Sequence, residues 1–281
     1  MNSIKIVTDT GADIGAELAQ QYNIELIPIP VEINNTQYQD YIDITPEEFY
    51  QKLDKTNANP TTSRITPHHF INIFSDLLKD YEEVIYISFS SQLSGIHESA
   101  AMAKNNIDSD NLSIIDSKAA SFGQGLIALK AAKLAQTEKS KETIISTIKN
   151  QINKIEHIFA VGSLDMLKQG GRISSTKAFI GKLLNITPIA EVTSEGEIVS
   201  LSKVRGKRKF IRFMLKEMEE RGNNLSKQTI GISHAQNRAL AETLAQKIEE
   251  KFSVKEVIIT KIGAAIGSHA GPGTVALFFY N

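Results

Sequence analysis

The sequence contains no cysteine among its 281 residues. This excludes disulfide bonds, thiol nucleophiles and cysteine-ligated zinc or iron–sulfur sites within the chain. The net charge is only −1, from 31 basic and 32 acidic residues, so bulk electrostatics favour neither nucleic acid nor an anionic membrane as a partner. No apolar run approaches the length of a membrane span, and residues 1–9 lack the apolar core of a signal peptide. These absences predict a cytoplasmic protein without an integral membrane segment.

Common cofactor and metal motifs are missing as well. No Gly-x-Gly-x-x-Gly follows the first predicted strand and no P-loop occurs, which argues against a nucleotide site. His68 and His69 are adjacent, and the other histidines are scattered without the spacing of metal ligands. We therefore expect neither a cofactor nor a metal ion.

The first half of the chain alternates strand-like and helical segments, which predicts an α/β fold with a parallel sheet and helices on both of its faces. An irregular strand is expected over residues 24–33, because Pro28 and Pro30 interrupt it. Asp13 is expected to cap a helix over 14–22. The other strands are predicted at 4–7, 84–88 and 112–116, and the other helices at 67–79, 95–105, 119–137 and 141–154, with one more starting at Pro46.

After about residue 157 the pattern changes to a mixture of hairpin and strand–helix–strand units. Strands are predicted at 158–161, 186–192, 198–204, 229–233, 254–260 and 274–280, and helices at 175–184, 207–221 and 238–252. The length is comfortable for two hydrophobic cores. We therefore predict two domains, residues 1–157 and 158–281, the second a mixed α/β domain, with a cleft between them.

The turn from Ser90 to Gly95 lies between a buried strand and a helix. The unpaired amides and partial positive charge of the helix start favour an anion there, and the serine hydroxyls add donors. The alternative is that Ser94 merely caps the helix.

Three further segments carry polar side chains that are candidates for a site. Thr61-Thr62-Ser63 precedes a helix, and Arg172 follows two glycines; both are also typical of ordinary turns and surface ion pairs. The glycine-rich segment 263–273 surrounds His269, a setting that favours a site role over a core histidine. A basic cluster over 203–209 starts a helix, where cations are mildly unfavourable, which hints at an anionic partner or ligand.

A serine hydrolase is the alternative enzyme class. Ser94, His269 and Asp116 would supply its triad, but Gln92 stands where the nucleophile elbow Gly-x-Ser-x-Gly requires glycine.

In combination these motifs resemble the DegV family, which includes the FakB fatty-acid-binding partners of bacterial fatty acid kinase. The resemblance covers nearly the whole chain. It is carried by Thr61-Thr62-Ser63, Ser90-Ser91-Gln92-Leu93-Ser94-Gly95, Asp116-Ser117, Gly170-Gly171-Arg172-Ile173, Arg205 and Ile266-Gly267-Ser268-His269-Ala270-Gly271-Pro272-Gly273.

The resemblance implies a lipid-binding subunit that is not itself a catalyst. A long-chain fatty acid would lie between the domains, and a partner kinase would phosphorylate its carboxylate with ATP to supply phospholipid synthesis. Thr62 and Ser94 would bind the carboxylate, and His269 and Arg172 would lie close to it. Ser63 and Ser91 complete the implied ligand-binding set, and the implied surface for the kinase comprises Arg205, Lys207 and Arg208.

Overall fold

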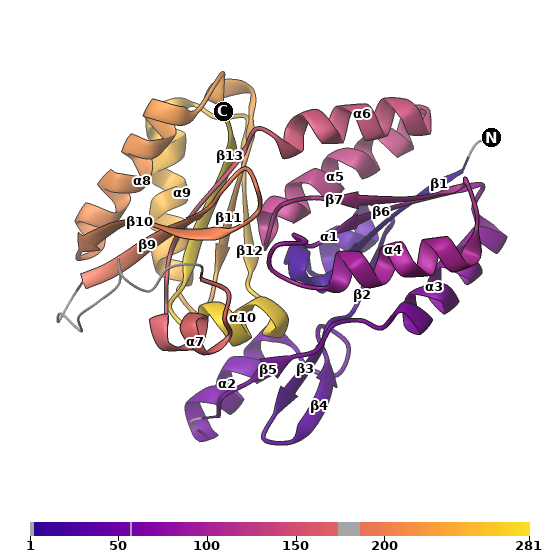
Figure 1. Ribbon diagram of the computed structural model, residues 1–281. Coiled ribbons are helices and arrows are strands. Elements are labelled where there is room, and N and C mark those ends of the chain that lie inside the picture. Colours follow the sequence, from indigo (N-terminus) through magenta and orange to yellow (C-terminus); the bar gives the residue numbers. More distant parts are fainter. Residues whose placement is uncertain (1–2, 57, 174–185) are drawn as a thin grey trace.

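The computed structural model describes residues 3–56, 58–173 and 186–281, and its first half is built on a four-stranded parallel sheet (Figure 1). The strand order is β2-β1-β6-β7, and all neighbouring pairs are parallel. The sheet consists of β1 (Ile4–Asp9), β2 (Ile24–Ile27), β6 (Glu83–Ser88) and β7 (Leu112–Asp116). Side chains of β6 alternate between two hydrophobic clusters, so both faces of this sheet are buried.

Helices cover both faces, which confirms the predicted parallel α/β architecture. On one face Phe70 and Phe74 of α3 pack against Tyr86 of β6, with α4 beside α3. On the other face Ile85 and Ile87 of β6 belong to the cluster that contains α5 and α6. The helices around this sheet are α1 (Gly15–Gln21), α3 (Pro67–Asp80), α4 (Ile96–Ile107), α5 (Phe122–Gln136) and α6 (Lys141–Ile152).

The second half forms a six-stranded mixed sheet, as predicted, in the order β10-β9-β8-β13-β11-β12. Only β11 and β12 pair in parallel; the other neighbours are antiparallel. Helices α8 and α9 pack on the outer face of this sheet. The strands are β8 (Ile155–Ala160), β9 (Ile186–Val192), β10 (Ile198–Arg205), β11 (Thr229–His234), β12 (Glu256–Lys261) and β13 (Val275–Tyr280); the helices are α7 (Leu164–Gln169), α8 (Lys207–Arg221), α9 (Arg238–Phe252) and α10 (Ala264–Ala270).

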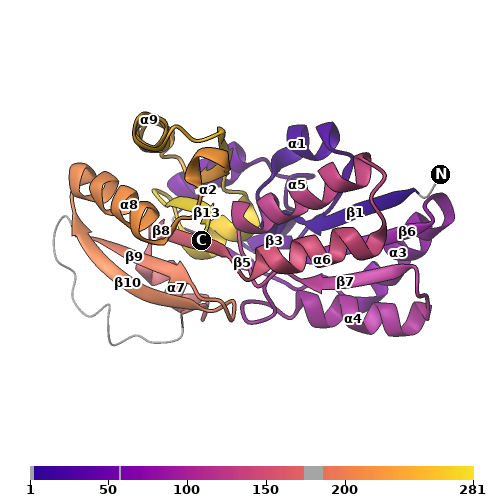
Figure 2. The same ribbon diagram turned by 90° about the horizontal axis from the view of Figure 1, so that it is seen from above.

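Helix α5 joins the two halves, which lie side by side in Figures 1 and 2. It is apolar and buried along most of its length, as expected of a helix enclosed by protein on all sides. It contacts β1 and β6 of the first sheet and β8, β11 and β13 of the second. One hydrophobic cluster therefore extends from Ile6 to Phe278 across both sheets. The expected domain division at residue 157 falls within β8 and stays a prediction.

The predicted irregular strand over 24–33 is wrong as a single element. β2 ends at Ile27, and Pro30 starts β3 (Pro30–Ile33) in a separate antiparallel sheet with β4 (Thr36–Gln39) and β5 (Thr61–Thr62). Prolines lack the amide that a continuous strand would need, so the chain changes sheet between them. Helix α2 (Pro46–Thr56) lies beside this small sheet (Figure 1) and starts at Pro46 as predicted. A capping box precedes it, in which Thr45 and Glu48 exchange hydrogen bonds.

Asp13 does not cap the first helix, contrary to expectation. It ends the short 3-10 helix η1 (Thr10–Ala12) in a left-handed conformation, with φ of 48°. Its carboxylate instead accepts hydrogen bonds from Ser121 and Gly263. A second 3-10 helix, η3, spans Leu225–Lys227. The predicted helix over 175–184 lies outside the described residues.

Candidate functional site

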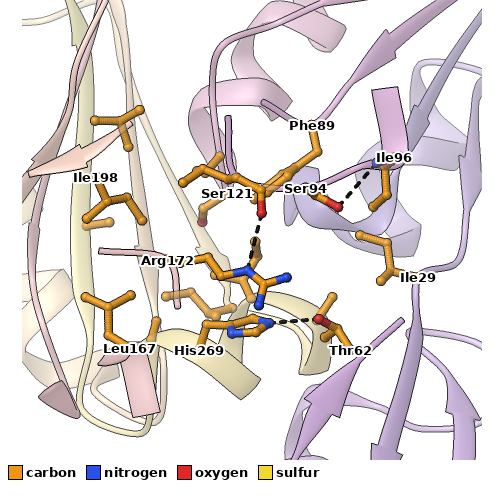
Figure 3. Close-up of a pocket in the computed structure, with 18 of the residues that line it drawn as sticks. Ile29, Thr62, Phe89, Ser94, Ile96, Ser121, Leu167, Arg172, Ile198 and His269 are labelled. Atoms are coloured by element: carbon orange, nitrogen blue, oxygen red, sulfur yellow. Dashed lines mark hydrogen bonds between the residues drawn. The ribbon is translucent and has the colours of Figure 1, made fainter. Parts of the chain in front are cut away.

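A cavity of about 360 Å³ lies between the two halves of the molecule (Figure 3). Its lining from the first half comes from the β6–α4 turn, the loop before α5, β5 and the residues that follow β5. Its lining from the second half comes from α7, α10 and the inner face of the mixed sheet. The polar segments that the sequence indicated as candidates for a site, at strand ends and in loops, therefore line one internal cavity.

The polar end of this cavity, which we call the headgroup end, is formed by Thr62, Ser94, Arg172 and His269. Thr62 on β5 and His269 on α10 point toward each other, and Thr62 Oγ1 lies 2.8 Å from His269 Nε2 (Figure 3). Burial, and to a lesser degree the charge of Arg172, lower the pKa of His269 to about 4, so its imidazole is neutral at pH 7. His269 Nδ1 is buried and has no hydrogen-bond partner among the described residues.

Ser94 is presented by a tight turn at the start of α4. The amides of Leu93 and Ser94 both donate to the carbonyl of Ser90, which fixes the turn. Ser94 Oγ accepts a hydrogen bond from the Ile96 amide at 3.3 Å, but the N-cap position of α4 is Gly95, so Ser94 is not the cap residue expected as the alternative. The same half-buried hydroxyl lines the cavity, where it retains its own proton for a ligand acceptor.

Arg172 brings positive charge to the headgroup end. Its Nε donates to the Leu93 carbonyl at 3.3 Å and its Nη1 donates to the Gly170 carbonyl. Burial lowers the pKa of Arg172, yet the guanidinium remains charged. Arg64 also lines the cavity, whereas no aspartate or glutamate occurs in the described lining. An anion at the headgroup end would therefore meet cations and hydroxyl donors without a competing carboxylate.

Around these polar groups the cavity wall is mainly aliphatic and aromatic, with side chains contributed by both halves. They include Ile29, Phe89, Leu93, Ile96, Phe159, Leu167, Val192, Ile198, Ile262, Ile266 and Phe278. Ser121, Thr274 and His157 add polar groups to this wall, and burial lowers the pKa of His157 to about 4, so it too is uncharged at pH 7. The cavity thus combines a polar headgroup end with a predominantly apolar wall.

A smaller cavity of about 140 Å³, which we call the antechamber, adjoins the headgroup end. Thr62, Arg172 and His269 line both cavities, so they form the partition between them. The remaining lining of the antechamber is mostly polar or small: Asn59, Pro60, Thr61, Met166, Gln169, Gly170 and Ser268.

The structure brings five of the six predicted ligand-binding residues to the main cavity: Thr62, Ser63, Ser94, Arg172 and His269. Ser91 is exposed and absent from the lining; its hydroxyl donates to Asp116 at 2.6 Å. The expected docking residues lie elsewhere, with Arg205 at the end of β10 and Lys207 and Arg208 at the start of α8, all exposed.

The hydrolase triad is not assembled in the structure. His269 Nε2 is bonded to Thr62 and not to Ser94. Asp116 accepts from Ser91 and from the Lys118 amide, and it does not line the cavity. Neither His269 nor Asp116 is therefore positioned to activate the Ser94 hydroxyl.

Ser121 is a cavity residue that the sequence did not reveal. Its backbone has φ of 52° and ψ of −147°, a conformation that non-glycine residues rarely adopt. Its hydroxyl donates to Asp13 at 2.5 Å and lies 2.8 Å from Ser233 Oγ. These partners are 108 and 112 residues away in the chain, so no local pattern could have identified them.

Within the described ranges, no group of three or more histidine, aspartate or glutamate side chains is arranged to hold a metal ion. Among the helices in those ranges, none has both the length and the apolar character that crossing a bilayer requires.

The comparisons with known proteins agree with this geometry. A DegV domain-containing protein of Clostridium perfringens is 40% identical to this chain over 99% of it and 98% of the relative. A DegV family protein from Thermus thermophilus, whose structure is described as showing fatty acid binding, superposes with a TM-score of 0.92 at 28% identity over 99% of each chain. DegV from Bacillus subtilis, described as a fatty acid binding protein, gives a TM-score of 0.89 at 31% identity over 100% of each chain. A model of the DegV family matches residues 3–281, and the chain therefore belongs to the DegV family.

Proposed function

We propose that this protein binds one long-chain fatty acid, with its carboxylate at the headgroup end and its hydrocarbon chain along the apolar wall. The observation that carries the proposal is the composition of the cavity: an apolar space that ends at hydroxyls, an arginine and a neutral histidine, with no acidic residue in its described lining. DegV family structures from Thermus thermophilus and Bacillus subtilis, described as fatty acid binding, support the same ligand class.

The carboxylate contacts follow from the available donors. Thr62 and Ser94 would each donate a hydroxyl proton, as the family resemblance implies, while Arg172 supplies the charge. If His269 carries its proton on Nε2 and donates to Thr62, Thr62 Oγ1 is free to donate onward to the ligand. Ser63 completes the polar lining, whereas Ser91 is engaged by Asp116 and is not among these contacts.

The hydrocarbon chain would supply most of the affinity. Each buried methylene contributes about 0.8 kcal/mol, so a chain of about 15 methylenes contributes roughly 12 kcal/mol before the costs of association. The headgroup end would then mainly orient the acid.

The finer part of the proposal is that this chain presents the carboxylate to a partner kinase in the cytoplasm and is not itself an enzyme. The kinase would transfer the γ-phosphoryl group of ATP to a carboxylate oxygen, releasing ADP and giving an acyl phosphate for phospholipid synthesis. The antechamber supports this step, because it lies across the Thr62–His269 partition from the buried chain and has room beside Arg172. The exposed cations Arg205, Lys207 and Arg208 would contact an acidic surface of the kinase.

Mass spectrometry of lipid extracted from the purified, denatured protein tests the core of the proposal. We expect a long-chain fatty acid that exchanges with added oleate. Thr62→Val removes the hydroxyl at nearly constant volume and should weaken oleate binding about tenfold, whereas the control Thr62→Ser should retain binding within about threefold. Absence of any bound acid together with no oleate exchange would contradict the proposal.

A further inference from the structure

Two buried carboxylates from the first half of the chain hold the start of α10. Asp13 Oδ1 accepts a hydrogen bond from the Gly263 amide at 2.8 Å. The two carboxylate oxygens of Asp40 accept from the Ala264 and Ala265 amides at 2.9 and 3.1 Å. Both aspartates are fully buried. The first three amides of this helix region are therefore all satisfied by side chains more than 200 residues away in sequence.

These carboxylates are an unusual choice for holding a helix start. Neither has a lysine, arginine or histidine within salt-bridge distance in the described part of the chain, and burial of an unpaired carboxylate is costly. A neutral serine or asparagine would satisfy one amide at lower cost. What Asp40 adds is a pair of equivalent acceptors on successive amides, which fixes both the position and the rotation of the helix.

The other end of α10 is held by the same small sheet that carries Asp40. Asp40 directly follows β4, and Thr62, whose hydroxyl bonds His269, lies on β5; β3 pairs with both strands. The middle of the helix packs closely against α2, where a Cβ at Gly267 would lie 2.6 Å from the Tyr50 hydroxyl oxygen. Residues of the small sheet and its flank thus hold α10 at both ends: Asp40 holds its first turn, and Thr62 holds its last turn through His269.

We propose that Asp40, supported by Asp13, is a positioning residue for the headgroup end: it fixes the start of α10 so that the His269 imidazole stays against Thr62. If α10 is loosened, His269 leaves Thr62 and reaches water, and this effect does not depend on a ligand. A faster release of the fatty acid would follow from it, and this second effect rests on the proposed function. Arg172 is the charged group that faces His269.

Asp40→Asn tests the proposal at nearly constant shape. The asparagine keeps one acceptor oxygen but turns its NH2 group toward the second amide, so one of the two contacts is lost. We expect oleate to dissociate about tenfold faster. The thermal unfolding midpoint should stay within about 4 °C of that of the native protein, because the variant also removes the cost of a buried charge. Glu217→Gln is the control: it alters a buried carboxylate on α8 that pairs with Arg221 away from α10, and it should leave oleate dissociation unchanged.

A measurement on the ligand-free protein tests the role of Asp40 independently of the proposed function. NMR titration of His269 should give a pKa of about 4 in the native protein and a value moved toward 6.5 in Asp40→Asn, because the ring gains access to water. Ala264→Pro provides a second variant, since it removes one amide that Asp40 accepts from, at a helix position that tolerates proline. It should reproduce both effects.

Native oleate dissociation and a native His269 titration in both variants would overturn the positioning role. A fall of the unfolding midpoint by more than about 10 °C in both, with an unshifted His269 titration, would likewise overturn it and leave Asp40 a purely structural residue. If the native protein takes up no oleate, the proposed function fails, whereas the His269 titration still decides the role of Asp40.

Discussion

His157 and Asp40 show that single buried groups give this protein opposite responses to pH. Burial lowers the pKa of His157 to about 4, so His157 contributes stability that is present above pH 6.5 and lost as the pH falls toward 4. Burial raises the pKa of Asp40 to about 6, so the native state binds the proton of Asp40 more tightly than the unfolded chain does. Asp40 therefore adds stability as the pH falls from 6 to 4, and the two effects partly cancel.

Substitution of His157 should separate these contributions. With a pKa lowered from 6.5 to about 4, the imidazole of His157 decreases the free energy of unfolding by about 2 kcal/mol when the pH falls from 7 to 5. We expect the free energy of unfolding of His157→Gln to fall by about 2 kcal/mol less than that of the native protein over this pH interval, whatever the stability of the variant at pH 7. Urea denaturation at the two pH values measures the difference. Parallel pH dependence in the two proteins would show that the imidazole is not perturbed.

At the scale of elements, α10 depends on glycine for its close approach to α2. A Cβ at Gly267 would lie 2.6 Å from the Tyr50 hydroxyl oxygen and 2.8 Å from Phe49 Cε1, and both rings are buried. We expect Gly267→Ala to destabilise the protein by about 1–3 kcal/mol, because overpacking exceeds the gain in helix propensity. Gly95→Ala is the control, since its Cβ would make an ordinary contact at 3.5 Å with the flexible Arg64, and its stability should change by less than about 1 kcal/mol. Equal urea midpoints for both variants would contradict this account of α10.

The sequence was informative about elements wherever the signal was local. The glycine-rich setting of His269 favoured a site role on composition alone, whereas Thr62 and Ser94 were also consistent with an ordinary turn and a helix cap, and only the family resemblance assigned them to the ligand. Asp13 was misassigned because aspartate before a helical stretch is a common cap, whereas here the carboxylate bonds Ser121 and Gly263. Contacts between residues so far apart in sequence depend on how the two halves pack, which no local pattern encodes.

At the scale of the whole molecule, the two α/β halves share one core. Their existence and sheet types were predictable from the alternation of strands and helices. The shared helix α5 was recognisable as a helix, but nothing in its sequence shows that its faces contact two different sheets. The cavity follows from this arrangement, because it lies between the Phe89–Ile96 turn of one half and the inner face of the mixed sheet, which contributes Ile198 and Phe278.

A cavity formed in this way should recognise a fatty acid mainly by the length of its chain. If the apolar wall supplies the affinity, each added methylene contributes about 0.8 kcal/mol, which corresponds to roughly a fourfold lower dissociation constant. We expect saturated acids of increasing length to bind progressively more tightly until the chain fills the cavity, after which affinity should stop rising. Displacement of a fluorescent fatty acid from delipidated protein measures the series. Equal affinity for short and long acids would mean that the headgroup end dominates binding, which the predominance of apolar side chains along the cavity wall argues against.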